Sequence, residues 1–152
     1  MENSHQHTGA EDIKGVLRGS GLKITPQRIA IYKEVLDRRD HPTADKVHEA
    51  ISPLYPSVSL GTVYKTLDTL VNVGLLSRVA TDEVLLRYDA NPVQHHHLYL
   101  SDSGEIVDFY DDELAVLIRN HLEARSIKNF EIQDIRLQVT GKRIGPDAGT
   151  DD

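Results

Sequence analysis

The stretch from residue 57 to residue 74, SVSLGTVYKTLDTLVNVG, carries a start signal, an apolar stripe and a stop signal for one helix. A serine at 57 or 59 is typical of an N-cap, because its hydroxyl accepts a hydrogen bond from an unbonded backbone N–H. Gly74 is typical of a helix end, since glycine readily adopts left-handed backbone. The apolar stripe predicts that one side of this helix is buried. Its members are Leu60, Val63, Leu67, Leu70 and Val71.

Earlier helices begin at equally clear signals. Residues 13–17 show a short amphipathic pattern, and Thr25 is a capping residue followed by proline at the first helical position. Thr43 is expected to cap a third helix, which ends near Pro53. The apolar face predicted for that third helix consists of Val47, Ala50, Ile51 and Leu54.

Two short strand candidates, residues 75–80 and 84–88, follow the fourth helix and are joined by a turn through Thr81 and Asp82. Helices followed by a hairpin are typical of a winged helix-turn-helix. The remaining sequence predicts strands near 96–100 and 105–110, a helix over 111–124 and a strand over 130–139. So small an α/β unit has little sheet to cover, and we expect it to complete its core by dimerising.

The expected fold is therefore α+β, with an N-terminal winged helix-turn-helix domain and a small α/β dimerisation domain. The expected boundaries are 1–88 for DNA binding, 89–141 for dimerisation and metal sensing, and 142–152 for a disordered tail. Charge supports this division: residues 1–88 are neutral, whereas the rest carry the whole net charge of −7. A locally cationic face still binds phosphate in such a chain.

Composition excludes several classes of protein. The chain has no cysteine, which rules out disulfides, thiolate zinc sites and thiol-based redox sensing. No apolar run approaches the roughly 18 residues of a membrane helix, so no membrane partner is expected. The N-terminus lacks the basic start and apolar stretch of a signal peptide, which predicts a cytoplasmic location.

Histidines and aspartates in the second half predict a metal site. Alternate side chains of a strand share a face, so His95 and His97 are placed to bind one ion while the histidine between them points away. Asp89 and Asp108 stand at the ends of neighbouring strand candidates and could add carboxylates, and His41 could join from the first half. This donor set favours iron(II) or manganese(II), one ion per subunit, with an octahedral position left open.

The fourth helix also carries residues suited to DNA. Thr62 and Lys65 lie opposite its apolar stripe, and Tyr64 lies to one side near the N-terminal end. Such a helix reads base edges in the major groove. Lys23 and Arg28, around the second helix, are expected to bind the phosphate backbone. Double-stranded operator DNA is therefore the predicted partner.

Several segments, in order, resemble the ferric uptake regulator superfamily, and most closely its peroxide-sensing (PerR-like) branch. The resemblance runs from about Leu17 to Val139. The matching segments are LKITPQR (22–28), HPTAD (41–45), SVSLGTVYKTLDTLVNVGL (57–75), RYD (87–89), the H-x-H at 95–97 and GEIVDF (104–109).

The resemblance implies that His41, Asp89, His95, His97 and Asp108 hold a regulatory metal. Aspartate rather than glutamate at the last of these positions favours the peroxide-sensing branch. It also implies that Thr62 and Tyr64 lie at the DNA. The implied protein is a dimeric repressor rather than an enzyme. Its iron- or manganese-loaded form binds a pseudo-palindromic operator, and peroxide oxidation of His41 or His95 in the iron form releases the DNA.

One departure from the family leaves alternatives open. Most members hold a structural zinc with two C-x-x-C pairs, but here Leu100 and Ser103 stand at the first pair and the second is missing. We therefore expect no structural zinc, with packing in its place. Members without that zinc include haem-responsive iron regulators with a triple-His segment, so an iron or haem sensor is an alternative. A non-haem iron enzyme and a plain metal-storage or interaction protein are further alternatives.

Overall fold

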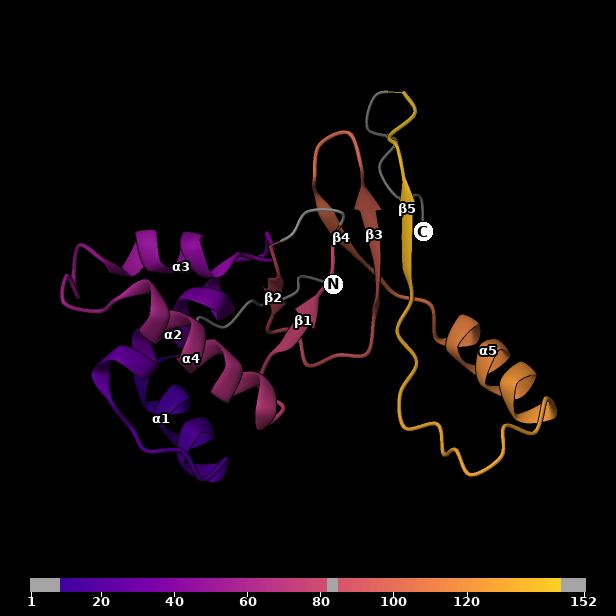
Figure 1. Cartoon of the computed structure of the whole chain (residues 1–152), viewed down its shortest axis with the longest axis horizontal. Helices are drawn as coiled ribbons and strands as arrows, with labels where there is room; N and C mark the ends of the chain where they lie inside the picture. Colours follow the sequence, from indigo (N-terminus) through magenta and orange to yellow (C-terminus); the bar gives the residue numbers. More distant parts are fainter. Residues whose placement is uncertain (1–8, 82–84, 146–152) are drawn as a thin grey trace. The chain divides into compact units, whose positions relative to one another are not determined.

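The computed structural model describes residues 9–81 and 85–145, and contacts within the chain divide it into two units, 1–92 and 93–152. Four helices make up most of the first unit, and two short strands complete it (Figure 1). The helices are α1 (Ala10–Gly19), α2 (Pro26–Asp37), α3 (Ala44–Ile51) and α4 (Leu60–Asn72). The expected fourth helix and its predecessors are thereby confirmed.

The start and stop signals act as their residue types predict. The side-chain hydroxyls of Thr25, Thr43 and Ser59 each accept a hydrogen bond from the backbone N–H three residues later. Each cap satisfies one of the N–H groups that a helix start leaves unbonded. After α4 the chain turns at Gly74, whose φ of 81° is the left-handed conformation expected of a helix-terminating glycine.

All four helices contribute side chains to one apolar core. The predicted stripe of α4 is confirmed, because Val63, Leu67 and Leu70 are fully buried. In the predicted face of α3, Val47 and Ile51 are buried as expected, but Ala50 is exposed. The prediction is also wrong at the end of the face, where Leu54 is 81% exposed. The reason is that α3 ends at Ile51, so Leu54 lies in the turn beyond it and no longer follows the helical spacing.

Two strands follow α4 and form an antiparallel pair, β1 (Ser77–Val79) and β2 (Arg87–Asp89). They are the hairpin expected after the helices, although shorter than the predicted strands. Residues 82–84, which include part of the predicted turn and the start of the second predicted strand, lie outside the described residues.

A three-stranded sheet in the order β4-β3-β5 forms the centre of the second unit. Strands β3 (His96–Leu100) and β4 (Ile106–Phe109) are antiparallel, and β5 (Gln138–Gly141) pairs with β3 in parallel. Directly opposed residues share a face of a sheet. One face therefore carries His97, Asp108 and buried Tyr99 and Ile106; the other carries half-buried Leu98 with exposed Val107, Phe109 and Val139.

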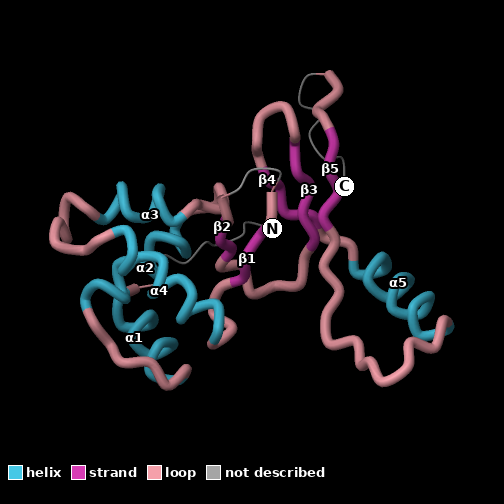
Figure 2. The backbone as a smooth tube through the Cα atoms, viewed as in Figure 1, coloured by secondary structure: helices cyan, strands magenta, loops and turns pink. Residues whose placement is uncertain are grey.

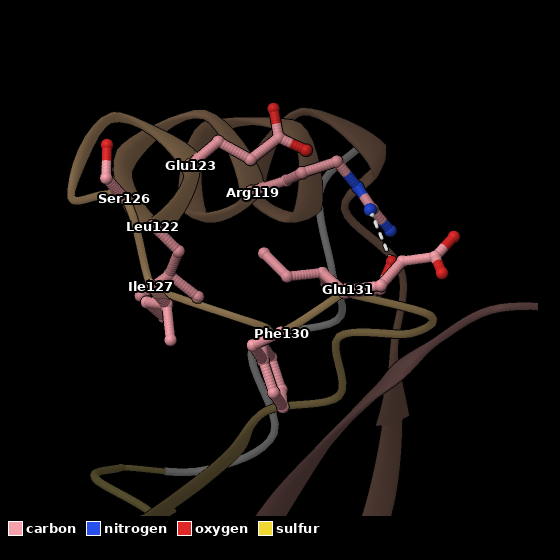
Figure 3. Close-up of a pocket in the computed structure, with 8 residues that line it drawn as sticks. Arg119, Leu122, Glu123, Ser126, Ile127, Phe130 and Glu131 are labelled. Carbon is pink, nitrogen blue, oxygen red and sulfur yellow. Dashed lines mark hydrogen bonds between the residues drawn. The ribbon is translucent and has the colours of Figure 1, made fainter.

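The strand predicted over 130–139 is wrong for most of its length. Figure 2 shows loop where that strand was expected, and β5 begins only at Gln138. Only scattered hydrogen bonds hold the backbone here. The Arg119 guanidinium donates to the Ile132 carbonyl at 2.9 Å, the Leu137 N–H donates to a ring nitrogen of His96, and the Leu137 carbonyl accepts from the His97 N–H of β3 at 2.9 Å. A pocket lined by Arg119, Leu122 and Phe130 separates this loop from the helix before it (Figure 3).

That helix, α5 (Asp112–Ala124), is capped by the Asp111 carboxylate, which accepts from the Leu114 N–H at 3.0 Å. None of its residues is fully buried, and Val116 and Leu117 are 57% and 65% exposed. Exposed apolar side chains therefore lie both on α5 and on the sheet face that carries Val107, Phe109 and Val139, and nothing in the described chain covers them. No helix among the described residues is long and apolar enough to cross a membrane.

Candidate metal centre and nucleic-acid interface

The first unit brings two of the predicted ligands together. His41 lies just before α3, and the carbonyl of the next residue, Pro42, accepts a hydrogen bond from the Tyr88 N–H at 3.0 Å. This contact ties the segment to β2, whose last residue is Asp89. Both side chains are about 95% buried, and His41 Nε2 lies 3.7 Å from Asp89 Oδ2. We call these two residues the upstream pair.

Local backbone contacts hold the upstream pair in place. Arg87 Nε donates to the His41 carbonyl at 2.6 Å, and the same guanidinium donates to the carbonyl of Asp40. His41 has a φ of 51°, a left-handed conformation that is uncommon outside glycine and needs such support. The Asn91 N–H donates to Asp89 Oδ1 at 2.9 Å, which fixes the carboxylate while Oδ2 faces the imidazole.

The second unit brings the other three predicted ligands together. His97 and Asp108 are directly opposed on β3 and β4, and His95 immediately precedes β3. His95 Nε2 lies 3.1 Å from His97 Nε2 and 3.5 Å from Asp108 Oδ1, and His97 Nε2 lies 3.6 Å from that same oxygen. We call His95, His97 and Asp108 the downstream trio.

A hydrogen bond to the backbone determines which ring nitrogen of His95 faces the other two residues of the trio. Its Nδ1 lies 2.5 Å from the Val93 carbonyl, which only accepts, so Nδ1 is the donor and, in the neutral imidazole that binds metal, Nε2 carries the lone pair. A backbone carbonyl on the outer nitrogen is the usual support of a metal-binding histidine. The trio therefore presents a lone pair, a second imidazole and a carboxylate to one point, and these donors fit a divalent iron or manganese ion.

His96 has a different role, as the alternation of a strand predicts. It is 2% exposed, and its Nδ1 accepts a hydrogen bond from the Leu137 N–H at 3.1 Å. The ring thus holds the start of β5 against β3. His96 thus points away from the site of its two neighbours, as predicted, because successive side chains of a strand lie on opposite faces of the sheet.

The residues predicted for DNA binding lie on α4 and around the start of α2. Thr62 and Lys65 are exposed and Tyr64 is half-buried. Lys23 is exposed, but the Arg28 guanidinium donates to the Lys23 carbonyl and the Arg28 side chain is half-buried. Arg28 therefore braces the segment before α2 within the protein, a role that the sequence did not indicate.

Two residues near these sites escaped sequence reasoning. Arg87 supports the His41 backbone across 46 positions of sequence, and Asp45 accepts a hydrogen bond from the Tyr64 hydroxyl across 19. Neither contact follows a helical or strand period, so no local pattern indicates it. The only available signal was that both lie within matched segments, RYD and HPTAD.

The model of the ferric uptake regulator family matches residues 19–140. The chain belongs to the ferric uptake regulator family. Its fold is accordingly α+β, with an N-terminal winged-helix DNA-binding domain and a dimerisation domain. Members of this family are metal-responsive transcriptional regulators rather than enzymes, and they act as dimers on operator DNA.

Individual relatives agree with this assignment. The chain is 32% identical over 138 residues to the peroxide-responsive repressor PerR of Staphylococcus aureus (strain Mu50), which covers 91% of this chain and 90% of that protein. Among solved structures, the ferric uptake regulator from Pseudomonas aeruginosa with manganese matches with a TM-score of 0.71 and 27% identity, over 86% of this chain and 96% of that one. The peroxide stress regulator of Campylobacter jejuni matches with a TM-score of 0.67 and 25% identity, over 95% and 98%.

Proposed function

We propose that this chain is a metal-dependent repressor that responds to peroxide. The observation that carries the proposal is the downstream trio, in which a fixed Nε2 lone pair, a second buried imidazole and a carboxylate converge. The Staphylococcus aureus relative named a peroxide-responsive repressor supports the sensing role. In this proposal residues 1–88 bind DNA, residues 89–141 dimerise and sense metal, and residues 142–152 form a tail.

The proposed ligands are His41, Asp89, His95, His97 and Asp108, around one iron(II) or manganese(II) ion per subunit. His41 belongs to the proposed DNA-binding part of the chain and the other four ligands to the proposed dimerisation part, so shared ligation would fix one part against the other. Iron(II) held by these residues would supply the electron that reduces peroxide, a reaction that manganese(II) does not readily support. No structural zinc is proposed, because the chain has no cysteine and Leu100 and Ser103 stand where the family's first C-x-x-C pair would be.

At the operator, we propose that Thr62, Tyr64 and Lys65 contact bases and nearby phosphates. Lys23 and Arg28 are proposed to contact the phosphate backbone of the DNA. A dimer places two such helices on the two half-sites of a pseudo-palindrome. The apolar surface of α5 and of the exposed sheet face supports dimerisation, since patches of this kind mark protein–protein contacts in soluble proteins.

Manganese(II) is expected to raise operator affinity by about 5- to 150-fold, the usual range of coupling between two ligands of one protein. Mobility shift with operator fragments selected from random DNA measures this, with magnesium(II) as the control ion. Equal affinity with and without manganese would contradict metal-dependent repression. Binding that responds instead to haem, together with a Soret band, would assign the chain to the haem-responsive alternative.

Brief peroxide treatment of the iron(II) form is expected to add one oxygen to the peptide containing His41 or to that containing His95, and to release the operator. Peptide mass spectrometry and mobility shift on the same samples measure the two effects. The manganese(II) form serves as the control and should gain no oxygen. An iron form that keeps both peptides unmodified and stays on the operator would rule out peroxide sensing and favour an iron-level sensor.

A further inference from the structure

One hydrogen bond joins the DNA-reading helix to the helix that begins beside the upstream pair. The Tyr64 hydroxyl on α4 donates to Asp45 Oδ2 on α3 at 3.4 Å. The Tyr64 ring packs against the apolar core, while Asp45 is exposed. Burial, and next the charge of Asp45, raise the pKa of the Tyr64 phenol above its usual value, so the hydroxyl keeps its proton and remains a donor.

Asp45 is also close in sequence to His41, with no flexible segment between them. The Pro42 carbonyl accepts from the Tyr88 N–H, and Thr43 both forms a β-bridge with Arg87 and caps α3. The helix begins at Ala44, and Asp45 stands in its first turn. Backbone contacts thus hold both residues that separate His41 from the first residue of α3.

We propose that Asp45 is a positioning residue that links the His41 segment to the base-reading hydroxyl of Tyr64. By accepting the phenol hydrogen bond, it fixes the Tyr64 hydroxyl relative to the start of α3, and metal ligation by His41 then stabilises the arrangement that reads the operator. This inference rests on the proposed function, because it requires His41 to be a ligand and α4 to contact DNA. Asp45 is an addition to the proposed function, in which it contacts neither the metal nor the DNA.

The test is a double-mutant cycle of Asp45→Ala and Tyr64→Phe, with operator affinity measured with and without manganese(II). Each single variant should lose about 3- to 10-fold in affinity in the manganese form, the usual effect of one hydrogen bond. The double variant should lose no more than the larger single loss. If the fold-loss of the double variant equals the product of the two single losses, the two residues act independently and the link is wrong.

Two control variants separate positioning from charge. Asp45→Asn keeps an acceptor oxygen without the charge, so it should retain the affinity of the unaltered protein. Glu49→Ala removes an exposed carboxylate from the same helix, one whose Oε2 lies 3.7 Å from Lys46 Nζ. This variant should leave the effect of manganese(II) on operator affinity unchanged. Thermal unfolding of each variant checks that the helices remain folded.

Base substitution across the operator gives a readout that a merely structural role would not move. Asp45→Ala should weaken discrimination at the same operator positions as Tyr64→Phe. If Tyr64→Phe loses discrimination while Asp45→Ala retains it, the link is wrong and the proposed function stands. If the unaltered protein shows no metal-dependent operator binding, the proposed function itself fails and the link fails with it.

Discussion

Replacing His97 with alanine is expected to lower manganese(II) affinity by more than about 100-fold, because loss of a residue that merely supports a ligand already costs 10- to 100-fold. His97 contacts both other members of the downstream trio: its Nε2 is 3.1 Å from that of His95 and 3.6 Å from the Asp108 carboxylate. Calorimetric titration of the purified protein measures the affinity, and metal-dependent operator binding should be lost in parallel.

His121→Ala is the matched control for that experiment, since it removes an imidazole from an exposed position on α5 in the same unit. Its manganese affinity should equal that of the unaltered protein. If His97→Ala also binds manganese normally while remaining folded, the downstream trio is not the regulatory site. The triple-His segment would then need another explanation.

Replacing Leu117 with glutamate is expected to convert the dimer to a monomer and to remove high-affinity operator binding. Leu117 is 65% exposed on α5, next to exposed Val116, within the surface we propose as the dimer interface. An unpaired carboxylate in an apolar interface costs several kcal/mol, which raises the dimer dissociation constant by about 100-fold or more. Sedimentation equilibrium measures the mass, and mobility shift measures binding.

The control makes the same leucine-to-glutamate change at Leu54, which is 81% exposed in the first unit. Leu54→Glu should leave the dimer mass unchanged. A Leu117→Glu protein that still sediments as a dimer would move the interface away from α5. The exposed sheet face around Val107 and Val139 would then be the next surface to test.

Local signals in the sequence predicted most of the first unit. The caps at Thr25, Thr43 and Ser59 and the stop at Gly74 act within three or four residues, so the sequence around them contains all that determines them. The strand period likewise predicted that His95 and His97 come together while His96 faces elsewhere.

Contacts between distant residues were beyond the reach of sequence periodicity. The alternating Ile135, Leu137 and Val139 predicted a long strand, but the Leu137 N–H binds His96 and only the last part of the segment pairs with β3. The long-range hydrogen bonds from Arg87 and Tyr64 could not be predicted either, because they follow no helical or strand period. Ligand assignment of the five metal residues, the DNA contacts and the domain boundaries stay predictions.

The topology of the second sheet has a consequence for folding during synthesis. Strands β3 and β4 form a hairpin, so the pairing that places His97 opposite Asp108 uses no residue beyond 109. The parallel pairing of β3 with β5 joins His97 to Gln138 and must wait until the intervening α5 and loop are made. Non-local pairing is the slower step because its loop-closure entropy is larger. Every residue of the downstream trio is therefore synthesised before Gln138–Gly141, the strand that completes the sheet.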